Sequence, residues 1–440
     1  MRRRKGLVFI SLIAALALVA SACGDDDDTT GSTAAPTAST AAPDDTTAPD
    51  DTTSPDDTAA PPDTTPPGEP FKFGMILVGP ENDRGWSQAH REGGEYVEEM
   101  LGAEMILLDL VNPADRPDVT VEAVAADMIA QGAQLVFATS DDMKDGVEAA
   151  AAQNPDVPMV WSSGDSAWAE GKRYRADLTN LANSMGQMQF GKMIAGCAAA
   201  LTTHTGSIGY VGPLINDETR LLVNSVYLGA NYCWTEVRGE TGPLAFEVNW
   251  IGFWFNIPGF TLDPTALTND FFDGGADVVI SGIDTTEVVV RTGQRFDAGE
   301  AVYAIPYDFE GACSEAPATC LGVPYFNWGP SYLDIAQRVI DGSFSNTFEW
   351  NGPDWADINN PDTSAVGWIH GDGLLGHPDR VVQVDEFIAG LGDGSISLYT
   401  GPLNWQDGST FLGDGEVGTD QQVWYAEQLL EGIVGASSAE

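Results

Sequence analysis

The sequence FKFGMILVGPENDRGWSQAH occupies residues 71–90 and sets the first strand, turn and helix of the folded part of the chain. Its apolar residues predict a buried strand that ends at a Gly-Pro pair, and Asp83 is one of two residues able to cap the helix that follows. Ligands of open α/β sheets bind in the crevice beyond the carboxyl ends of the strands. This turn is therefore expected to present Asp83, Trp86 and Gln88 to a cleft.

Asp83 and Trp86 each have two interpretations. An indole at this position offers a flat face to a ring, and a carboxylate accepts hydrogen bonds from N–H or O–H groups of a ligand. Alternatively, Asp83 only caps the helix and Trp86 only packs beneath it. The turn by itself favours neither interpretation.

Strand and helix patterns alternate after this turn. Strands are expected at 105–108, 134–138 and 158–161, with helical segments between them. This alternation predicts a parallel sheet with right-handed crossovers. Asp141 follows the end of the third strand and so belongs to the same edge of the sheet as the first turn.

The same pattern repeats in the second half of the chain. A helix over 183–201 leads to a strand at 207–212, which begins a second α/β unit. The polar and aromatic residues beyond its later strand ends are Trp254, Asn256, Asp284 and Asp308. Asp284 could instead cap a helix, and Trp254 could be a core residue. Because both units place an aromatic residue and carboxylates at strand ends, a shared ligand site is favoured.

Two similar lobes with facing carboxyl edges describe the α/β architecture of type I periplasmic-binding proteins, with two Rossmann-like lobes and parallel sheets. The chain is expected to cross between the lobes near Asp165, Asp308 and Ser345. The N-terminal lobe is predicted to comprise 71–165 and 309–345, and the C-terminal lobe 166–308 and 346–440.

The charge of the chain restricts its partners. The 440 residues include 66 acidic and 19 basic ones, for a formal net charge of −47. Such a surface repels nucleic acid and disfavours anionic ligands at short range, so a neutral or cationic ligand is expected. The four histidines have no metal-ligand spacing, and the Gly-x-Gly-x-x-Gly match at 371–376 precedes His-Pro rather than a helix. No metal and no cofactor are expected.

The N-terminus has the features of an export signal. Four basic residues precede an apolar run that is too short to span a bilayer, and residues 1–22 are predicted to be removed. The sequence before Cys23 is similar to a lipobox, so Cys23 is predicted to carry a lipid anchor on the outer face of the cell membrane. Cleavage near Ala22, giving a secreted protein, is the alternative. Residues 23–70, rich in Asp, Thr and Pro, are predicted to be a disordered tether.

The remaining four cysteines suggest two disulfides in an exported protein. Cys313 and Cys320 enclose a short loop and are expected to pair. Cys197 would then pair with Cys233.

The turn at 82–90 resembles the opening motif of the basic membrane protein family, which comprises lipid-anchored substrate-binding proteins of bacterial ABC importers, many of them binders of purine nucleosides. Other segments resemble the family in the same order along the chain. These are VNWIGFWF at 248–255, GGADVV at 274–279, SGID at 281–284, SLYTGP at 397–402, WY at 424–425 and EGIVG at 431–435.

The resemblance implies a base held between one aromatic residue of each lobe, here Trp86 and Trp254. It also implies acidic residues that hold base and ribose, here Asp83, Asp284, Asp141 and Asp308. Nucleoside binders often carry Phe-Asn where this chain has Trp86 and Ser87, and the amide of Gln88 is the expected substitute.

We therefore expect a solute-binding lipoprotein that captures a nucleoside by hinge closure and delivers it to an ABC permease with its ATPase, without catalytic residues. Two indoles and several carboxylates would equally suit a quaternary amine. A receptor that presents its ligand to a sensor kinase would use the same body. A nucleoside hydrolase is less favoured, because the first turn lacks a metal-binding cluster of aspartates.

Overall fold

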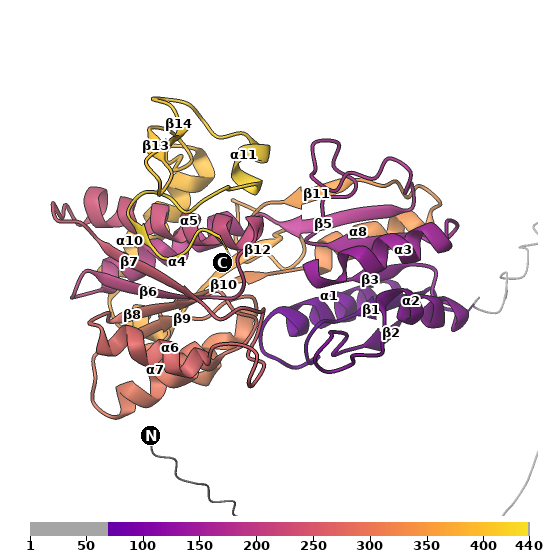
Figure 1. The fold of residues 1–440 in the computed structure, drawn as a ribbon, viewed down its shortest axis with the longest axis horizontal. Helices are drawn as coiled ribbons and strands as arrows, with labels where there is room; N and C mark the ends of the chain where they lie inside the picture. The colour runs from indigo at the N-terminus through magenta and orange to yellow at the C-terminus, as the bar shows by residue number, and fades with distance from the viewer. Residues whose placement is uncertain (1–68, 439–440) are drawn as a thin grey trace, which may run out of the picture. The chain divides into compact units, whose positions relative to one another are not determined.

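The computed structural model describes residues 69–438, and within them the chain forms two α/β lobes (Figure 1). The sheet of lobe 1 has six parallel strands in the order β11-β5-β4-β3-β1-β2. Its strands are β1 (Lys72–Ile76), β2 (Glu104–Leu108), β3 (Val136–Ala138), β4 (Met159–Ser162), β5 (Leu181–Gly186) and β11 (Phe348–Asn351). The helices of this lobe are α1 (Trp86–Leu101), α2 (Val121–Ala130), α3 (Lys144–Gln153) and α8 (Gly329–Ile340).

The sheet of lobe 2 has five parallel strands in the order β15-β7-β6-β8-β9. These strands are β6 (Ser207–Gly212), β7 (Ala245–Trp250), β8 (Val278–Ser281), β9 (Tyr303–Ile305) and β15 (Ile433–Val434). The helices are α4 (Met188–Thr202), α5 (Asp217–Tyr232), α6 (Pro264–Asp273), α7 (Glu287–Asp297), α9 (Asp372–Leu375), α10 (Pro378–Asp393) and α11 (Asp420–Trp424). The predicted fold class, two lobes with parallel sheets, is confirmed.

Strands β10 (Gly322–Phe326) and β12 (Val366–His370) form an antiparallel pair that lies between the two sheets (Figure 1). β10 begins beside β9 of lobe 2, where Leu321 N–H donates to the Ala304 carbonyl. It ends at Phe326, whose ring packs edge-on against Trp86 of lobe 1, with 5.3 Å between ring centroids. This pair therefore connects the lobes, as expected of a hinge.

The strand pairing corrects two expectations. Residues 181–186 form β5, which pairs with β4, so the helix expected from 183 begins only at Met188. β5 and β11 both belong to the sheet of lobe 1, although the predicted C-terminal-lobe ranges include them. The reason is that β5 is fully buried between two neighbours, so tertiary pairing overrides its weak strand pattern. The lobe ranges as a whole stay a prediction.

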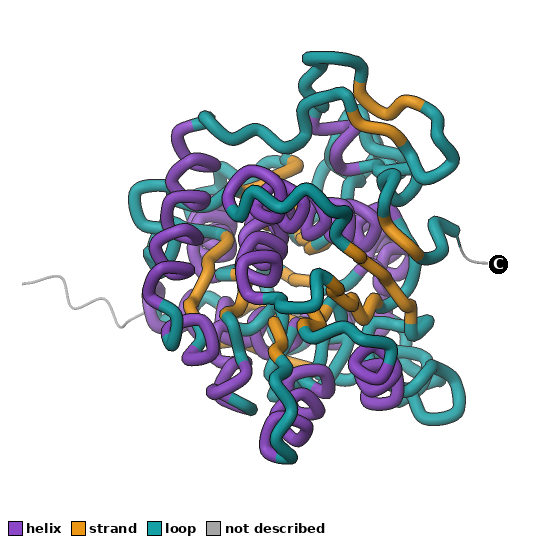
Figure 2. The backbone as a smooth tube through the Cα atoms, turned by 90° about the vertical axis from the view of Figure 1, so that its left-hand side faces the viewer, coloured by secondary structure: helices purple, strands orange, loops and turns teal. Residues whose placement is uncertain are grey.

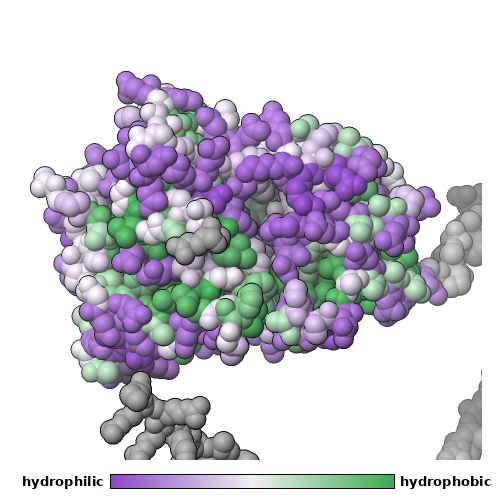
Figure 3. All heavy atoms as spheres, viewed as in Figure 1, coloured by the Kyte–Doolittle hydropathy of each residue, from purple (hydrophilic) through white to green (hydrophobic). Residues whose placement is uncertain are grey.

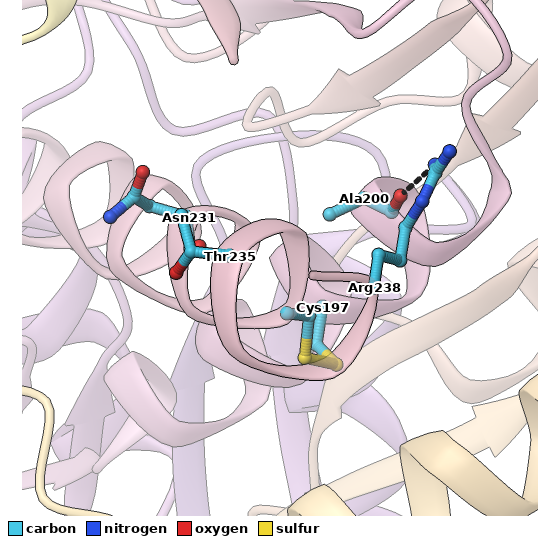
Figure 4. The surroundings of a disulfide bond; sticks show 6 residues. Cys197, Ala200, Asn231, Thr235 and Arg238 are labelled. Carbon is cyan, nitrogen blue, oxygen red and sulfur yellow. Dashed lines mark hydrogen bonds between the residues drawn. A yellow bond between two sulfur atoms is a disulfide. The ribbon is translucent and has the colours of Figure 1, made fainter. Parts of the chain in front are cut away.

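Both expected disulfides are present. Cys197 of α4 joins Cys233, the first residue of a π-helical turn that continues α5 (Figure 4). Arg238, at the end of this turn, donates from a guanidinium nitrogen to the Ala200 carbonyl over 2.7 Å. A Cβ at Gly196 of α4 would overlap the backbone of α5, so only glycine permits this close helix contact. α4 and α5 are thus fixed to each other beneath the sheet.

Hydrophilic residues cover much of the face seen in Figure 3, as the acidic composition predicts. The hairpin of β13 (Leu403–Asn404) and β14 (Thr410–Leu412) stands at the edge of lobe 2 (Figures 1 and 2). Within residues 69–438, no helix combines the length and hydropathy needed to cross a bilayer. The expected signal peptide, Cys23 and nearly all of the tether lie outside the described residues.

Candidate functional site

A cavity is lined by residues of both lobes. The lining residues from lobe 1 are Trp86, Ser140, Asp141 and Ser163, and those from lobe 2 are Pro213, Glu218, Thr219, Leu222, Trp254, Gly282, Asp284 and Tyr307. Each follows a parallel strand, so the cavity occupies the carboxyl edges of both sheets.

In the first turn, the carboxylate of Asp83 is bound by its own chain. Its oxygens accept hydrogen bonds from the N–H groups of Gly85 (2.9 Å), Ser87 (3.0 Å) and Gln88 (3.0 Å). Burial raises the pKa of Asp83 to about 6, and the backbone N–H groups that favour the ionised form oppose this shift. Asp83 is not among the residues that line the cavity. Its geometry is that of a cap for α1.

Trp86 both packs and lines the cavity. Its indole N–H donates to the Thr139 carbonyl over 2.6 Å, and its ring makes edge contacts with His90 and Trp328 at centroid distances of 4.6 and 5.5 Å. Only 7% of its surface is exposed. Trp86 is also among the residues that line the cavity, so its packing is shown and its contact with a ligand stays a prediction.

Ser87 and Gln88 serve the turn itself. The hydroxyl of Ser87 accepts from Gly79 N–H over 3.0 Å. The amide of Gln88 accepts from Arg84 N–H (3.1 Å) and donates to Glu92 (3.0 Å). Neither residue lines the cavity, so a direct ligand contact by either would require a rearrangement of the turn.

Trp254 enters the cavity from lobe 2, and it is 8% exposed. Its carbonyl accepts from Asp284 N–H over 3.0 Å, which ties the ends of β7 and β8 together. Asn256 is partly exposed, accepts from the Thr261 hydroxyl over 3.1 Å and does not line the cavity. The structure therefore brings Trp86 and Trp254, but not Asn256, to one cavity.

Asp284 and Asp308 are buried carboxyls of lobe 2 with exposed fractions of 5% and 0%. Both oxygens of Asp308 lack a hydrogen-bond partner among the described residues. Burial, with the neighbouring carboxyl adding repulsion for Asp284, raises the pKa of both groups. Asp308 also adopts φ = 71°, a left-handed backbone conformation that is uncommon outside glycine and found at functional sites.

Sequence reasoning missed Glu218 and Lys192. Glu218 is the second residue of α5 and lines the cavity, and burial raises its pKa to about 8. Lys192 is fully buried in α4, donates to the Ser281 carbonyl over 2.9 Å and lies 3.3 Å from the ring centroid of Tyr307. Burial lowers the pKa of Lys192 to about 7. A lone lysine in an otherwise apolar helix was the signal that could have revealed it.

Asp141 lines both this cavity and an adjoining pocket of about 650 Å³, and its carboxylate lies 3.2 Å from Lys144 Nζ. The lobes also touch directly at the rim. Lys172 Nζ of lobe 1 lies 2.6 Å from the carboxylate of Asp217 in lobe 2, and Arg84 pairs with Glu315. A Cβ at Gly85 would overlap the Asp284 carbonyl. These contacts describe a closed arrangement of the lobes.

No group of three or more His, Cys, Asp or Glu side chains between residues 69 and 438 has the arrangement of a metal site. The carboxylates of the cavity are instead distributed over separate strand ends. Their chemistry is that of hydrogen-bonding groups.

Comparison with known proteins relates this chain to ligand-binding proteins of ABC transporters. The model of the Bmp family, described as ABC transporter substrate-binding protein PnrA-like, matches residues 71–242. A purine-binding protein of Brucella abortus is 27% identical over 366 residues, which cover 83% of this chain and 93% of that protein. A Haloferax volcanii protein described as an ABC transporter glucose-binding protein is 25% identical over 288 residues, 65% of each chain.

Among solved structures, a solute-binding protein of an ABC transporter system from Aeropyrum pernix superposes with a TM-score of 0.58 at 13% identity. The match covers 76% of this chain and 93% of that structure. At this identity the likeness concerns the fold, and it supports the type I periplasmic-binding-protein architecture.

Proposed function

We propose that this chain, whose residues 71–242 match the family model of PnrA-like ABC transporter substrate-binding proteins, captures a nucleoside between its two lobes and delivers it to a permease. The single observation that carries this proposal is the shared cavity. Trp86 of lobe 1 and Trp254 of lobe 2 both line it, together with the buried carboxyl of Asp284.

The proposed binding mode is a base stacked on the two indoles. Base–aromatic stacking is worth about 1–3 kcal/mol per face in truncation experiments. Two faces and a few hydrogen bonds are enough for micromolar binding, about −8 kcal/mol. The name of the Brucella abortus relative, a purine-binding protein, supports a purine base as the stacked ring.

A second candidate ligand is a cationic amine. The observation that favours it is the acidic lining, where Asp141, Glu218 and Asp284 are the charged residues among those that line the cavity. Carboxylates and indole faces both attract a cation.

Thermal-shift and calorimetric titrations with nucleosides, quaternary amines and glucose test the proposal. A bound ligand stabilises the folded state by RT ln(1 + [L]/Kd), so the melting temperature should rise with nucleoside concentration. A response to amines alone would transfer the function to the second candidate. Chromatography of the same mixtures checks for free base, because its accumulation with turnover would show hydrolysis instead of binding.

We further propose that Cys23 carries the lipid anchor and that residues 23–70 tether the lobes to the outer face of the membrane. Cys23→Ser should move the protein from the membrane fraction to the soluble fraction. Unchanged fractionation would point to another anchor or to none.

A further inference from the structure

The first turn of α5 contains three polar residues, and two of them are bound within the protein. Asn216 caps the helix by accepting from Thr219 N–H over 2.8 Å. Asp217 pairs with Arg220 of the same helix (2.6 Å) and with Lys172 of lobe 1 (2.6 Å). The third residue, Glu218, is directed to the cavity and also lines the adjoining pocket.

Within the described part of the chain, the carboxylate of Glu218 has neither a hydrogen-bond donor nor an ion-pair partner. Burial is the largest influence on its pKa, Asp141 adds repulsion, and Lys192 partly compensates. An acidic group in the first turn also complements the positive end of the helix dipole, but that interaction is available to Asp217 as well. Glu218 is partly exposed, and a partly desolvated carboxylate without a partner destabilises the ligand-free fold.

A second observation directs this unsatisfied acceptor toward a ligand. Asp284, 95% buried, lines the same cavity, and the described structure places no hydrogen-bond donor on its carboxyl. Two carboxyls on separate elements, α5 and the end of β8, thus face one space. Groups of this kind persist where function requires them and where a partner arrives on binding.

We propose that Glu218 is a ligand-binding residue and that it accepts a hydrogen bond from an amino group on the base of the ligand. This inference rests on the proposed function and deepens it, because it names the part of the nucleoside that is recognised. A donor from the ligand favours the ionised form of Glu218, and an ionised carboxylate only accepts hydrogen bonds, so a base with an amino group is selected over one with a carbonyl or a bare carbon at the same position. The ligand class is therefore an amino-substituted base.

The test is isothermal titration of the wild-type chain and of Glu218→Gln with two ligand pairs, guanosine with inosine and adenosine with purine riboside. Each pair differs at a single amino group. For the amino-bearing member that wild type prefers, Glu218→Gln should weaken binding at least about fivefold, since a charge-assisted hydrogen bond becomes a neutral one. For the partner without the amino group the change should stay below about twofold.

The melting temperature of the ligand-free protein separates this role from a structural one. Above pH 8, where the Glu218 carboxyl of the folded protein is ionised, removal of this unpartnered charge in Glu218→Gln should raise the melting temperature by about 2 °C or more, whereas loss of a dipole interaction would lower it. Glu122→Gln is the matched control, because Glu122 occupies the same second position of α2 away from the cavity. Glu122→Gln should change neither the affinity for nucleosides nor the melting temperature of the ligand-free protein.

Two results would overturn the inference. One is nucleoside binding in which Glu218→Gln leaves both members of each pair unaffected or weakens both equally. The other is a lowered melting temperature with unchanged affinity. If no nucleoside binds the wild-type chain at all, the proposed function itself fails, so the two failures are distinguishable.

Discussion

The two sides of the cavity, here called walls, differ in how nearby carboxyl groups are bound. The lobe 1 wall includes the turn that holds Asp83, a carboxylate behind the lining residues, and the lobe 2 wall includes the start of α5 and the ends of β8 and β9. In lobe 1, the carboxylate of Asp83 accepts three backbone N–H groups of its own turn. In lobe 2, both buried oxygens of Asp308 lack a partner within the described residues, and no hydrogen bond is formed there by the carboxyls of Glu218 and Asp284, of which Glu218 is partly exposed. In the lobe 1 wall the carboxylate has its hydrogen-bond donors within the protein, whereas the lobe 2 wall has carboxyl groups that a ligand can supply with donors.

This difference teaches which wall carries stability and which carries recognition. A satisfied acceptor contributes to folding, while an unsatisfied buried one destabilises the ligand-free state and becomes useful only when a donor arrives. Substitutions in lobe 1 should therefore affect mainly the fold. Those in lobe 2 should affect mainly binding.

The largest expected effect is on stability in lobe 1. Trp86→Ala removes the hydrogen bond to Thr139 and the edge contacts with His90, Phe326 and Trp328. The free energy of unfolding should fall by about 3–5 kcal/mol, as for other buried Trp truncations. Denaturant unfolding measures it. A loss below 1 kcal/mol would show that Trp86 is not a packing residue and would weaken the contrast between the walls.

The next effect concerns contact between the walls. Gly85→Ala places a methyl group against the Asp284 carbonyl, so the lobes cannot close as described. If the closed state falls to about 1% of molecules, the apparent affinity drops about a hundredfold. Titration with the preferred nucleoside measures this. Gly242→Ala is the control, because an added Cβ there meets no atom within 4 Å. Equal affinities for both variants would mean that binding does not need this closure.

A smaller effect is expected at the indole of lobe 2. Trp254→Ala should weaken nucleoside binding by about tenfold or more, because one stacking face is lost. Trp254→Phe, which keeps an aromatic face, should recover most of the affinity. Calorimetric titration of the wild type and both variants measures the nucleoside affinity. A loss of affinity in Trp254→Phe equal to that in Trp254→Ala would argue against stacking.

The smallest effect is a dependence of stability on pH. Burial raises the pKa of Glu218 from its usual 4.5 to about 8, so the folded state holds a proton between these values that the unfolded state has released. The stability linked to Glu218 is fully present below pH 4.5 and is lost as the pH rises toward 8. The charge of Asp141 further raises the pKa of Glu218, and the charge of Lys192 lowers it.

Urea unfolding of the ligand-free protein at several pH values should show this contribution, at most about 1 kcal/mol per pH unit, and Glu218→Gln should remove it. Identical pH profiles for both proteins would place the Glu218 carboxyl in contact with solvent.

The alternation of strands and helices was predictable from the sequence because hydrophobic periodicity is local. So was the cluster of ligand candidates, since Trp86, Asp141, Trp254 and Asp284 each follow a strand and all line the cavity. The strand β5 was not predictable, because its sequence LANSMG has no alternating pattern and its pairing depends on distant neighbours. Glu218 escaped notice for a different reason. An acidic residue in a first helical turn is usual, and only the tertiary structure shows that this one faces a cavity.

The link between Cys197 and Cys233 has a practical consequence. The disulfide joins α4 to the end of α5. Lys192 lies on α4 and Glu218 lies at the start of α5, so these two ionisable residues are on a cross-linked pair of helices. Recombinant chain made in a reducing cytosol would lack this disulfide, and the lobe 2 side of the cavity would be less rigid. Preparations intended for ligand screening should come from an oxidising compartment or be refolded with a thiol–disulfide couple.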